Sequence, residues 1–281
     1  MNDAAARPFF SLPTLPKADA EDLHRAVTAL RRRTGIVLGE HKIDMAGRTL
    51  GLHAHRAGMS SVREYLTMIE QNVGSPEWNQ LISAFTVNHT AFFREKYHFE
   101  ILAEFCEARK NKPLSVWCCA SSTGEEPYSI AITMHEACGR ANAGMSVLAS
   151  DIDVHALARA RKGVYTMDRA RPIRPELLRR YFLRGAGAQA GMVMIKPFIR
   201  EMITFEEVNL VDASWPIKQK FDAIFCRNTM IYFDKPTQTR ILQRFAPLLK
   251  PGGLLFAGHS ENFTYLTDAF RLKGQTVYTA A

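Results

Sequence analysis

The chain has 281 residues, of which 47% are hydrophobic and 23% charged, a globular composition that can bury a substantial core. No apolar run approaches the roughly 20 residues that a membrane-spanning helix needs, which argues against an integral membrane protein. The five cysteines are odd in number and include no CxxC pair, which disfavours a disulfide framework or a zinc site. We therefore expect a cytoplasmic protein with free thiols and no metal site.

The formal net charge is +8, and much of the excess is concentrated near the N-terminus. Residues 23–63 contain eight Lys or Arg and two acidic residues, a local excess of six positive charges. A basic patch of this kind predicts an acidic partner, which can be nucleic acid, anionic lipid or an acidic protein surface. A solvated helical face is the alternative interpretation, and the scarcity of interspersed acids favours a partner.

The N-terminal part of the chain is predicted to be a flexible arm followed by a small all-helical domain. Residues 1–17 contain three prolines and no basic segment followed by an apolar one, so they lack the features of a signal peptide. From residue 18 to 84, apolar residues recur at helical spacing without strand alternation. Asp19 is placed to cap a first helix that ends at Gly35, a second helix covers about residues 40–55, and a third follows Ser61.

Residues 85–281 show a different rhythm, in which short apolar runs alternate with amphipathic helices. This pattern predicts an α/β domain with a doubly wound, mainly parallel sheet that is covered on both faces. The C-terminal tail is predicted to add a closing antiparallel pair, and residues 168–200 are predicted to form an inserted helix and glycine-turned β-hairpin. The predicted sheet strands are 114–120, 145–151, 202–210, 221–228 and 253–260, with helices at 127–138, 155–164 and 235–250.

The loop after the first predicted strand indicates the kind of ligand. In an open α/β sheet, ligands bind outside the carboxyl ends of the strands. This loop lacks GxGxxG, and Glu125 and Glu126 at the following helix N-terminus would repel a phosphate. A ligand with a cationic end and no phosphate is favoured, such as S-adenosylmethionine, whose ribose hydroxyls suit Asp151 at the end of the second strand. Plain helix capping by the two acids is the alternative.

Several long motifs make this interpretation specific. VWCCASSTGEEPYSIAI, ASDID, FDAIFCRNTMIYFDK and LLKPGGLLFAGHSE follow one another, and NHTAFFRE precedes the sheet. In this order they resemble the chemoreceptor glutamate methyltransferase family, often called CheR, and the resemblance covers nearly the whole chain. It implies that S-adenosylmethionine is the methyl donor. It also implies methylation of glutamate side chains on chemoreceptor cytoplasmic helices, which yields glutamate methyl esters and S-adenosylhomocysteine.

The resemblance also assigns roles to individual residues. Glu125 is expected near the methionyl ammonium of the cofactor, and Asp151 at its ribose. Arg94 and Tyr232 are expected to hold the incoming glutamate carboxylate near the transferred methyl group. The cofactor contacts that the resemblance implies are Asn88, Thr90, Arg94, Glu125, Asp151, Asn209, Leu210, Arg227 and Asn228.

The partner surfaces are predicted in the same way. The basic face with Lys42, Arg48 and Arg56 is expected to dock on acidic receptor helices. In the family, the inserted hairpin can bind a short peptide at the receptor C-terminus, and this chain keeps the glycine spacing of that loop at Gly185, Gly187 and Gly191.

Two other functions remain open at this point. A sequence pI of about 9.3 suggests a nucleic-acid methyltransferase, but the N/D-P-P-Y/F pattern of amino-group methylation is missing after the fourth strand. A non-catalytic sensor that keeps the cofactor pocket is the second alternative. The resemblance favours a receptor-modifying enzyme that binds no nucleic acid and does not insert into the membrane.

Overall fold

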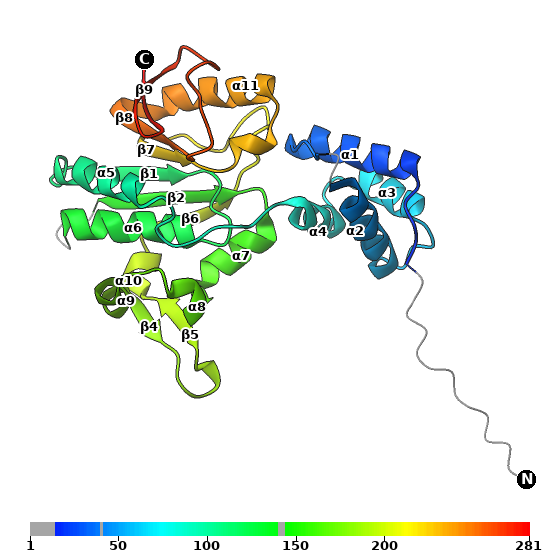
Figure 1. Ribbon diagram of the computed structural model, residues 1–281, viewed down its shortest axis with the longest axis horizontal. Coiled ribbons are helices and arrows are strands. Elements are labelled where there is room, and N and C mark those ends of the chain that lie inside the picture. The colour runs from blue at the N-terminus through cyan, green and yellow to red at the C-terminus, as the bar shows by residue number, and fades with distance from the viewer. Residues whose placement is uncertain (1–14, 40–41, 140–143) are drawn as a thin grey trace, which may run out of the picture.

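The computed structural model describes residues 15–39, 42–139 and 144–281. The arm predicted for residues 1–17 lies outside the described residues as far as residue 14. Figure 1 shows a helical domain, coloured blue to cyan, beside a larger α/β domain from which a small subdomain projects. Within the described residues, no helix combines the length and apolar character required to cross a bilayer.

Four helices form the N-terminal domain around a core of their own. Asp19 accepts a hydrogen bond from the backbone N–H of Asp22 at 2.7 Å and so caps the first helix, as predicted. The core contains Leu30, Leu50 and Leu66, one from each of the first three helices. The bounds of the four helices are α1 (Ala20–Thr34), α2 (Ile43–Arg56), α3 (Val62–Gln71) and α4 (Pro76–Phe85).

The α/β domain contains a seven-stranded sheet in the order β6-β2-β1-β7-β8-β10-β9. The first five strands in this order run parallel, and β10 and β9 close the sheet as an antiparallel pair. The predicted doubly wound, mainly parallel fold is therefore confirmed. The strands are β1 (Leu114–Cys118), β2 (Met145–Asp151), β6 (Ile203–Glu207), β7 (Phe221–Cys226), β8 (Leu249–Ala257), β9 (Phe270–Gly274) and β10 (Val277–Ala280).

Helices cover both faces of this sheet. Consecutive strand residues point to opposite sides, and both sides carry apolar side chains that pack against helices. Phe225 belongs to the core cluster that also holds residues of α5 and α6, whereas Ile224 belongs to the cluster that holds residues of α11. The helix α5 was not predicted. The helices of this domain are α5 (Lys96–Glu107), α6 (Glu125–Cys138), α7 (Val154–Lys162) and α11 (Lys235–Phe245), with short 3-10 turns η3 (Met230–Tyr232) and η4 (Ala246–Leu248).

The inserted subdomain is larger than the predicted hairpin. It contains a three-stranded antiparallel sheet in the order β3-β5-β4, so it begins near residue 164 and not 168. The extra strand spans three residues, too few to show a pattern in the sequence, and it forms by pairing with β5. Its elements are β3 (Val164–Thr166), α8 (Met167–Ala170), α9 (Pro175–Tyr181), β4 (Phe182–Arg184), η2 (Gly187–Gln189), β5 (Met192–Ile195) and α10 (Pro197–Arg200).

Candidate active site

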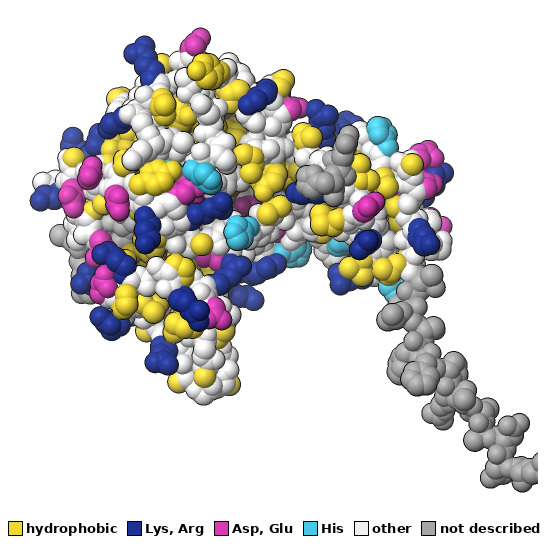
Figure 2. Space-filling model, viewed as in Figure 1, with side chains coloured by type: hydrophobic (Ala, Val, Ile, Leu, Met, Phe, Trp, Pro, Cys, Tyr) yellow, Lys and Arg dark blue, Asp and Glu magenta, His cyan; other side chains and the backbone are white. Residues whose placement is uncertain are grey.

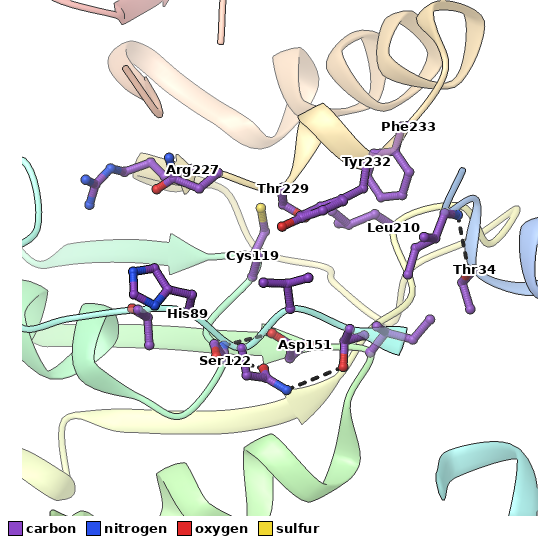
Figure 3. Close-up of a pocket in the computed structure, with 18 of the residues that line it drawn as sticks. Thr34, His89, Cys119, Ser122, Asp151, Leu210, Arg227, Thr229, Tyr232 and Phe233 are labelled. Atoms are coloured by element: carbon purple, nitrogen blue, oxygen red, sulfur yellow. Dashed lines mark hydrogen bonds between the residues drawn. The ribbon is translucent and has the colours of Figure 1, made fainter. Parts of the chain in front are cut away.

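A cleft lies over the carboxyl ends of β2, β1 and β7, where the order of the strands reverses (Figure 3). The space between its walls amounts to about 890 Å³, including the part open to solvent. All predicted cofactor and catalytic residues except Glu125 line it: Asn88, Thr90, Arg94, Asp151, Asn209, Leu210, Arg227, Asn228 and Tyr232.

The helical domain supplies part of the wall. Thr34, the last residue of α1, and Ile36, in the segment between α1 and α2, line the cleft. Gly35 between them has φ of 74°, and a Cβ at this position would lie 2.5 Å from a side-chain carbon of Val211. A glycine is therefore required for α1 to approach the sheet domain this closely. Sequence reasoning did not predict that this segment reaches the site.

Asp151 is held by backbone groups alone. Its carboxylate accepts hydrogen bonds from the N–H of Ser122 at 2.7 Å and from the N–H of Asp153 at 2.9 Å. Among the described residues, no cation lies within ion-pair distance of it. Burial raises the pKa of Asp151 to about 6 in spite of these hydrogen bonds. Its remaining lone pairs can accept hydrogen bonds from hydroxyl groups, as the predicted ribose contact requires.

Asn88 connects two loops at the floor of the cleft. Its side-chain N–H donates to the carboxylate of Asp153 at 2.7 Å, and its oxygen accepts from the hydroxyl of Ser122 at 2.8 Å. Asp153 also accepts hydrogen bonds from Ser83 and Thr86 at the end of α4. The residue thus lines the cleft and also fixes the loop that follows β1 to the segment that leaves the helical domain.

A buried charge network forms one end of the cleft, which we call the charged end: Arg227, Glu126 and Glu95. The guanidinium of Arg227 bonds to Glu126, lies 3.1 Å from Glu95, and donates to the carbonyl oxygen of Arg94 at 2.6 Å. Burial would raise the pKa of Glu95, but Arg227 and His259 overcome it and lower the value to about 2. Burial likewise opposes the charge of Arg227, whose pKa is nevertheless raised by the two carboxylates.

Glu125, the acid expected near the methionyl ammonium, does not line the cleft, whereas its neighbour Glu126 does. Glu125 is buried away from the cleft, where it accepts a hydrogen bond from the hydroxyl of Thr123 at 2.7 Å and pairs with Arg169. Glu126 lines the cleft. Adjacent residues of a helix point about 100° apart, so the two acids face different directions, and the sequence alone does not say which of them faces the cleft.

The residues predicted to hold the substrate meet at the same cleft. A guanidinium N–H of Arg94 donates to the carbonyl oxygen of His89 at 3.0 Å, which directs the side chain along the cleft wall. Tyr232 comes from η3 on the other side, and burial raises the pKa of its phenol, so it stays neutral at ordinary pH. The ammonium of Lys42 lies 5.7 Å from the centre of the Tyr232 ring. Figure 3 shows this ring extending over the cleft above Asp151.

Two further predicted contacts lie on loops that leave the sheet. Asn209 follows β6, and its amide donates to the carbonyl oxygen of Arg33 at 2.7 Å. Asn228 follows β7 and has φ of 56°, a left-handed conformation that is uncommon for a residue other than glycine. Such strain persists only where surrounding contacts enforce it, and it concentrates at functional sites.

The predicted partner residues lie outside the cleft. Arg48 and Arg56 are exposed on α2. Gly187 and Gly191 have positive φ in the turn between β4 and β5. Several other basic residues of the helical domain are paired with acids: Arg25 with Glu70, Arg31 with Asp234, and Arg63 with Asp19, Glu21 and Asp22. Figure 2 shows acidic side chains next to basic ones at the outer edge of this domain.

Comparisons with known proteins agree with this geometry. The family described as "CheR methyltransferase, SAM binding domain" matches residues 88–279, and "CheR methyltransferase, all-alpha domain" matches residues 21–86. The chain belongs to the CheR methyltransferase family. It is 48% identical over 264 residues to "Chemotaxis protein methyltransferase" of Klebsiella aerogenes, covering 94% of this chain and 90% of the relative. It is 49% identical over 254 residues to the Salmonella typhimurium protein of that name, covering 90% and 88%.

As a member of this family, the chain is an S-adenosylmethionine-dependent methyltransferase. The residues present fit the cofactor. Asp151 offers acceptor positions for a pair of hydroxyls, and Glu126 brings a carboxylate to the cleft where a phosphate ligand would be repelled. The cleft also has an apolar wall suited to a flat ring, formed by Ile36, Val208 and Leu210.

Proposed function

We propose that this chain transfers the methyl group of S-adenosylmethionine to glutamate side chains of chemoreceptors, which yields glutamate methyl esters and S-adenosylhomocysteine. One observation carries the proposal. Arg94 and Tyr232, which suit a carboxylate, line the same cleft as Asp151 and Glu126, which suit the methyl donor. Methylation of a chemoreceptor's cytoplasmic helices requires a cytoplasmic enzyme.

The reaction needs alignment more than acid–base chemistry. A glutamate with a pKa near 4.3 is ionised at neutral pH, so its oxygen is a nucleophile without a general base. This oxygen bonds to the methyl carbon while the carbon–sulfur bond breaks and its electron pair stays on sulfur. The carboxylate and the sulfonium become a neutral ester and a thioether. Because charge is neutralised, orientation dominates and supplies several kcal/mol, up to roughly 7–11 in ideal cases.

Arg94 and Tyr232 are proposed to provide that orientation. The bond from Arg94 to the carbonyl oxygen of His89 fixes the guanidinium, whose other N–H groups remain available to a carboxylate. A charge-assisted bond from arginine withdraws electron density from the oxygen it binds, so Arg94 serves to position the carboxylate and not to activate it. The neutral phenol of Tyr232 can donate a hydrogen bond to the same group.

The test uses tritiated methyl transfer to membranes that contain the receptor. We expect Arg94→Ala and Tyr232→Phe to lower the rate of ester formation by about a hundredfold, since misplacing reacting groups by about 1 Å has an effect of this order. Calorimetry with S-adenosylhomocysteine reports separately on the cofactor site. Full activity in both variants, with cofactor binding unchanged, would remove the assignment.

The receptor helix is proposed to dock along α2. Lys42, Arg48 and Arg56 form no ion pair with any described residue, unlike Arg25 and Arg63 of the same domain. The proximity of Lys42 to the Tyr232 ring joins this surface to the methyl-transfer site. Replacing Arg48 and Arg56 with glutamine is expected to raise KM for the receptor, with the effect shrinking at high salt, and to leave kcat unchanged.

A receptor tail peptide is proposed to bind at the inserted subdomain. The strand β4 lies at an edge of the three-stranded sheet, and an edge strand can accept an extended peptide by hydrogen bonding. Gly185, Gly187 and Gly191 lie in the turn that joins β4 to β5, next to this edge strand. Calorimetric titration of a receptor-tail peptide against the wild-type chain and a Gly187→Val variant tests the proposal, and an absence of binding heat would refute it.

A further inference from the structure

Glu261 lies outside the cleft, yet one carboxylate organises the loop that carries the predicted substrate-binding tyrosine. The residue follows β8, and its side chain is only 4% exposed. Its carboxylate accepts four backbone N–H groups: Gly258 at 2.7 Å, Asn228 at 2.8 Å, Thr229 at 3.0 Å and Met230 at 2.7 Å. Three of these donors are consecutive residues of the loop after β7. A single anion thus fixes the backbone of that loop.

The arrangement explains the left-handed conformation of Asn228. A non-glycine residue in such a conformation is strained and needs other contacts to maintain it. Here the conformation lets the N–H groups of residues 228–230 converge on one point, and an ionised acceptor strengthens each bond. A Cβ on Gly258 would lie 2.4 Å from the side-chain nitrogen of Asn228 and 2.9 Å from the carboxylate of Glu261, so the two loops meet without spare room.

The loop held in this way leads directly to Tyr232. The N–H of Tyr232 donates to the carbonyl oxygen of Thr229 at 3.1 Å, so the position of η3 depends on the residues that Glu261 binds. From the other side, the amide of Gln238 donates to the carbonyl oxygens of Met230 and Phe233 at 2.9 and 2.8 Å. Glu261 is absent from the wall of the cleft. It therefore acts on the site from behind, through this loop and through its charge, which adds to the effect of burial in raising the pKa of the Tyr232 phenol.

We propose that Glu261 is a positioning residue for methyl transfer, which sets the place of Tyr232 through the backbone of Asn228, Thr229 and Met230. The inference rests on the role proposed above for Tyr232. Its consequence is a specific kinetic pattern. Loss of the carboxylate should displace the phenol and also loosen Asn228, a predicted cofactor contact, while leaving Asp151 at the end of β2 in place. The rate constant kcat should therefore fall by a much larger factor than cofactor affinity.

The first experiment compares Glu261→Gln with Asp222→Asn in the full chain. Asp222 is a matched control, because its buried carboxylate also accepts a backbone N–H, that of Ser115. Asp222 lies near the start of β7, whereas Glu261 binds the loop that follows the end of β7. We expect Glu261→Gln to lower kcat about tenfold to a hundredfold, KM for receptor to stay within about threefold of wild type, and the affinity for S-adenosylhomocysteine to fall by less than about tenfold. Asp222→Asn should lower Tm and leave kcat unchanged. A wild-type kcat in Glu261→Gln would overturn the inference.

The second experiment asks whether the effect passes through Tyr232. In the double variant with Tyr232→Phe, the loss caused by Glu261→Gln should shrink, because residues that act as one unit are not additive. Fully additive losses would overturn the inference and leave the role of Tyr232 intact. Full activity of Tyr232→Phe alone would instead remove that role, and the inference with it. If Glu261→Gln does not fold, Glu261→Asp is assayed in its place. This variant keeps the charge but is one methylene shorter, and the same changes in kcat support or overturn the inference.

Discussion

The two ends of the cleft are built in different ways. At the charged end, Arg227 is buried between Glu126 and Glu95 within the α/β domain. At the other end, which we call the junction end, Thr34, Ile36 and Leu210 meet where the helical domain approaches the sheet. Figure 3 shows Arg227 and Thr34 on opposite sides of the site. One end is closed by ions inside a single domain, and the other by contacts between two domains.

This difference in construction suggests that the charged end is rigid and the junction end adjustable. Breaking a buried ion pair leaves an uncompensated charge and is strongly destabilising, so the charged end keeps one geometry. The contacts that place the segment between α1 and α2 are at partly exposed residues, such as the pair of Arg31 with Asp234 and the bond from the N–H of Val37 to the carbonyl oxygen of Tyr232. These can be broken at a smaller cost. The charged end is thus the fixed reference for the cofactor.

Arg227→Met is expected to have the largest effect on the protein. It leaves Glu126 buried without a cation and Glu95 with His259 alone, and we expect the free energy of unfolding to fall by about 3–5 kcal/mol in urea titrations. Arg180→Met is the control, because Arg180 pairs with Glu136 at the exposed surface, and it should lower stability far less. Equal losses in the two variants would show that the charged end is no more rigid than the surface.

The pair Glu126→Gln and Glu125→Gln distinguishes the two neighbouring acids. Glu126→Gln removes the carboxylate that lines the cleft, and we expect the affinity for S-adenosylhomocysteine to fall about tenfold to a hundredfold, the value of a hydrogen bond to a charged group. Glu125→Gln disturbs the pair with Arg169 and the bond from Thr123, both outside the cleft wall, so calorimetry should find the affinity close to that of wild type. If only Glu125→Gln weakened the binding of S-adenosylhomocysteine, Glu125 and not Glu126 would be the acid near the methionyl ammonium.

We expect Asp151 to make cofactor binding depend on pH. Burial raises its pKa to about 6, and only the ionised carboxylate accepts both ribose hydroxyls. Affinity should be full above about pH 7 and fall as the pH drops through 6, approaching about tenfold per pH unit below it. The same group lowers the free energy of unfolding as pH rises from about 4 to 6, because the folded state then holds the proton more tightly.

Asp151→Asn provides the control for this pH profile. The amide keeps the shape but cannot ionise, and its N–H group faces backbone donors at Ser122 and Asp153. Affinity should be lower at every pH and nearly constant between pH 5 and 8 in calorimetric titrations. A profile that keeps its inflection near pH 6 in this variant would assign the titration to another group.

The sequence predicted the parts of the fold and site that depend on local pattern. Apolar runs located the parallel strands, and the residues after each run, such as Asp151 and Arg227, line the cleft because the carboxyl ends of parallel strands meet at one edge. The motif resemblance added Asn88 and Arg94, which precede the sheet and belong to no strand end. The short strand β3 was missed because three residues carry no periodicity.

What the sequence could not predict are contacts between distant segments. Glu95 pairs with Arg227, which is more than a hundred residues away, and no spacing rule connects them. Ile36 lines the cleft only because α1 closely approaches the sheet domain at Gly35. The choice between Glu125 and Glu126 depends on the rotation of α6 about its axis. Each of these needs the tertiary arrangement, since propensity and pattern describe only neighbouring residues.

Arg31→Ala is expected to have the smallest effect and tests the junction end most directly. Arg31 and Asp234 lie 2.7 Å apart with side-chain exposures of 56% and 35%. Asp234→Asn removes the charge but can still cap α11, because asparagine also accepts the bond from the N–H of Thr237. A double-mutant cycle on the free energy of unfolding should give a coupling of about 0.2–1 kcal/mol that shrinks at high salt. A coupling several times larger and insensitive to salt would mean that the junction end is held as firmly as the charged end, and the contrast between them would fail.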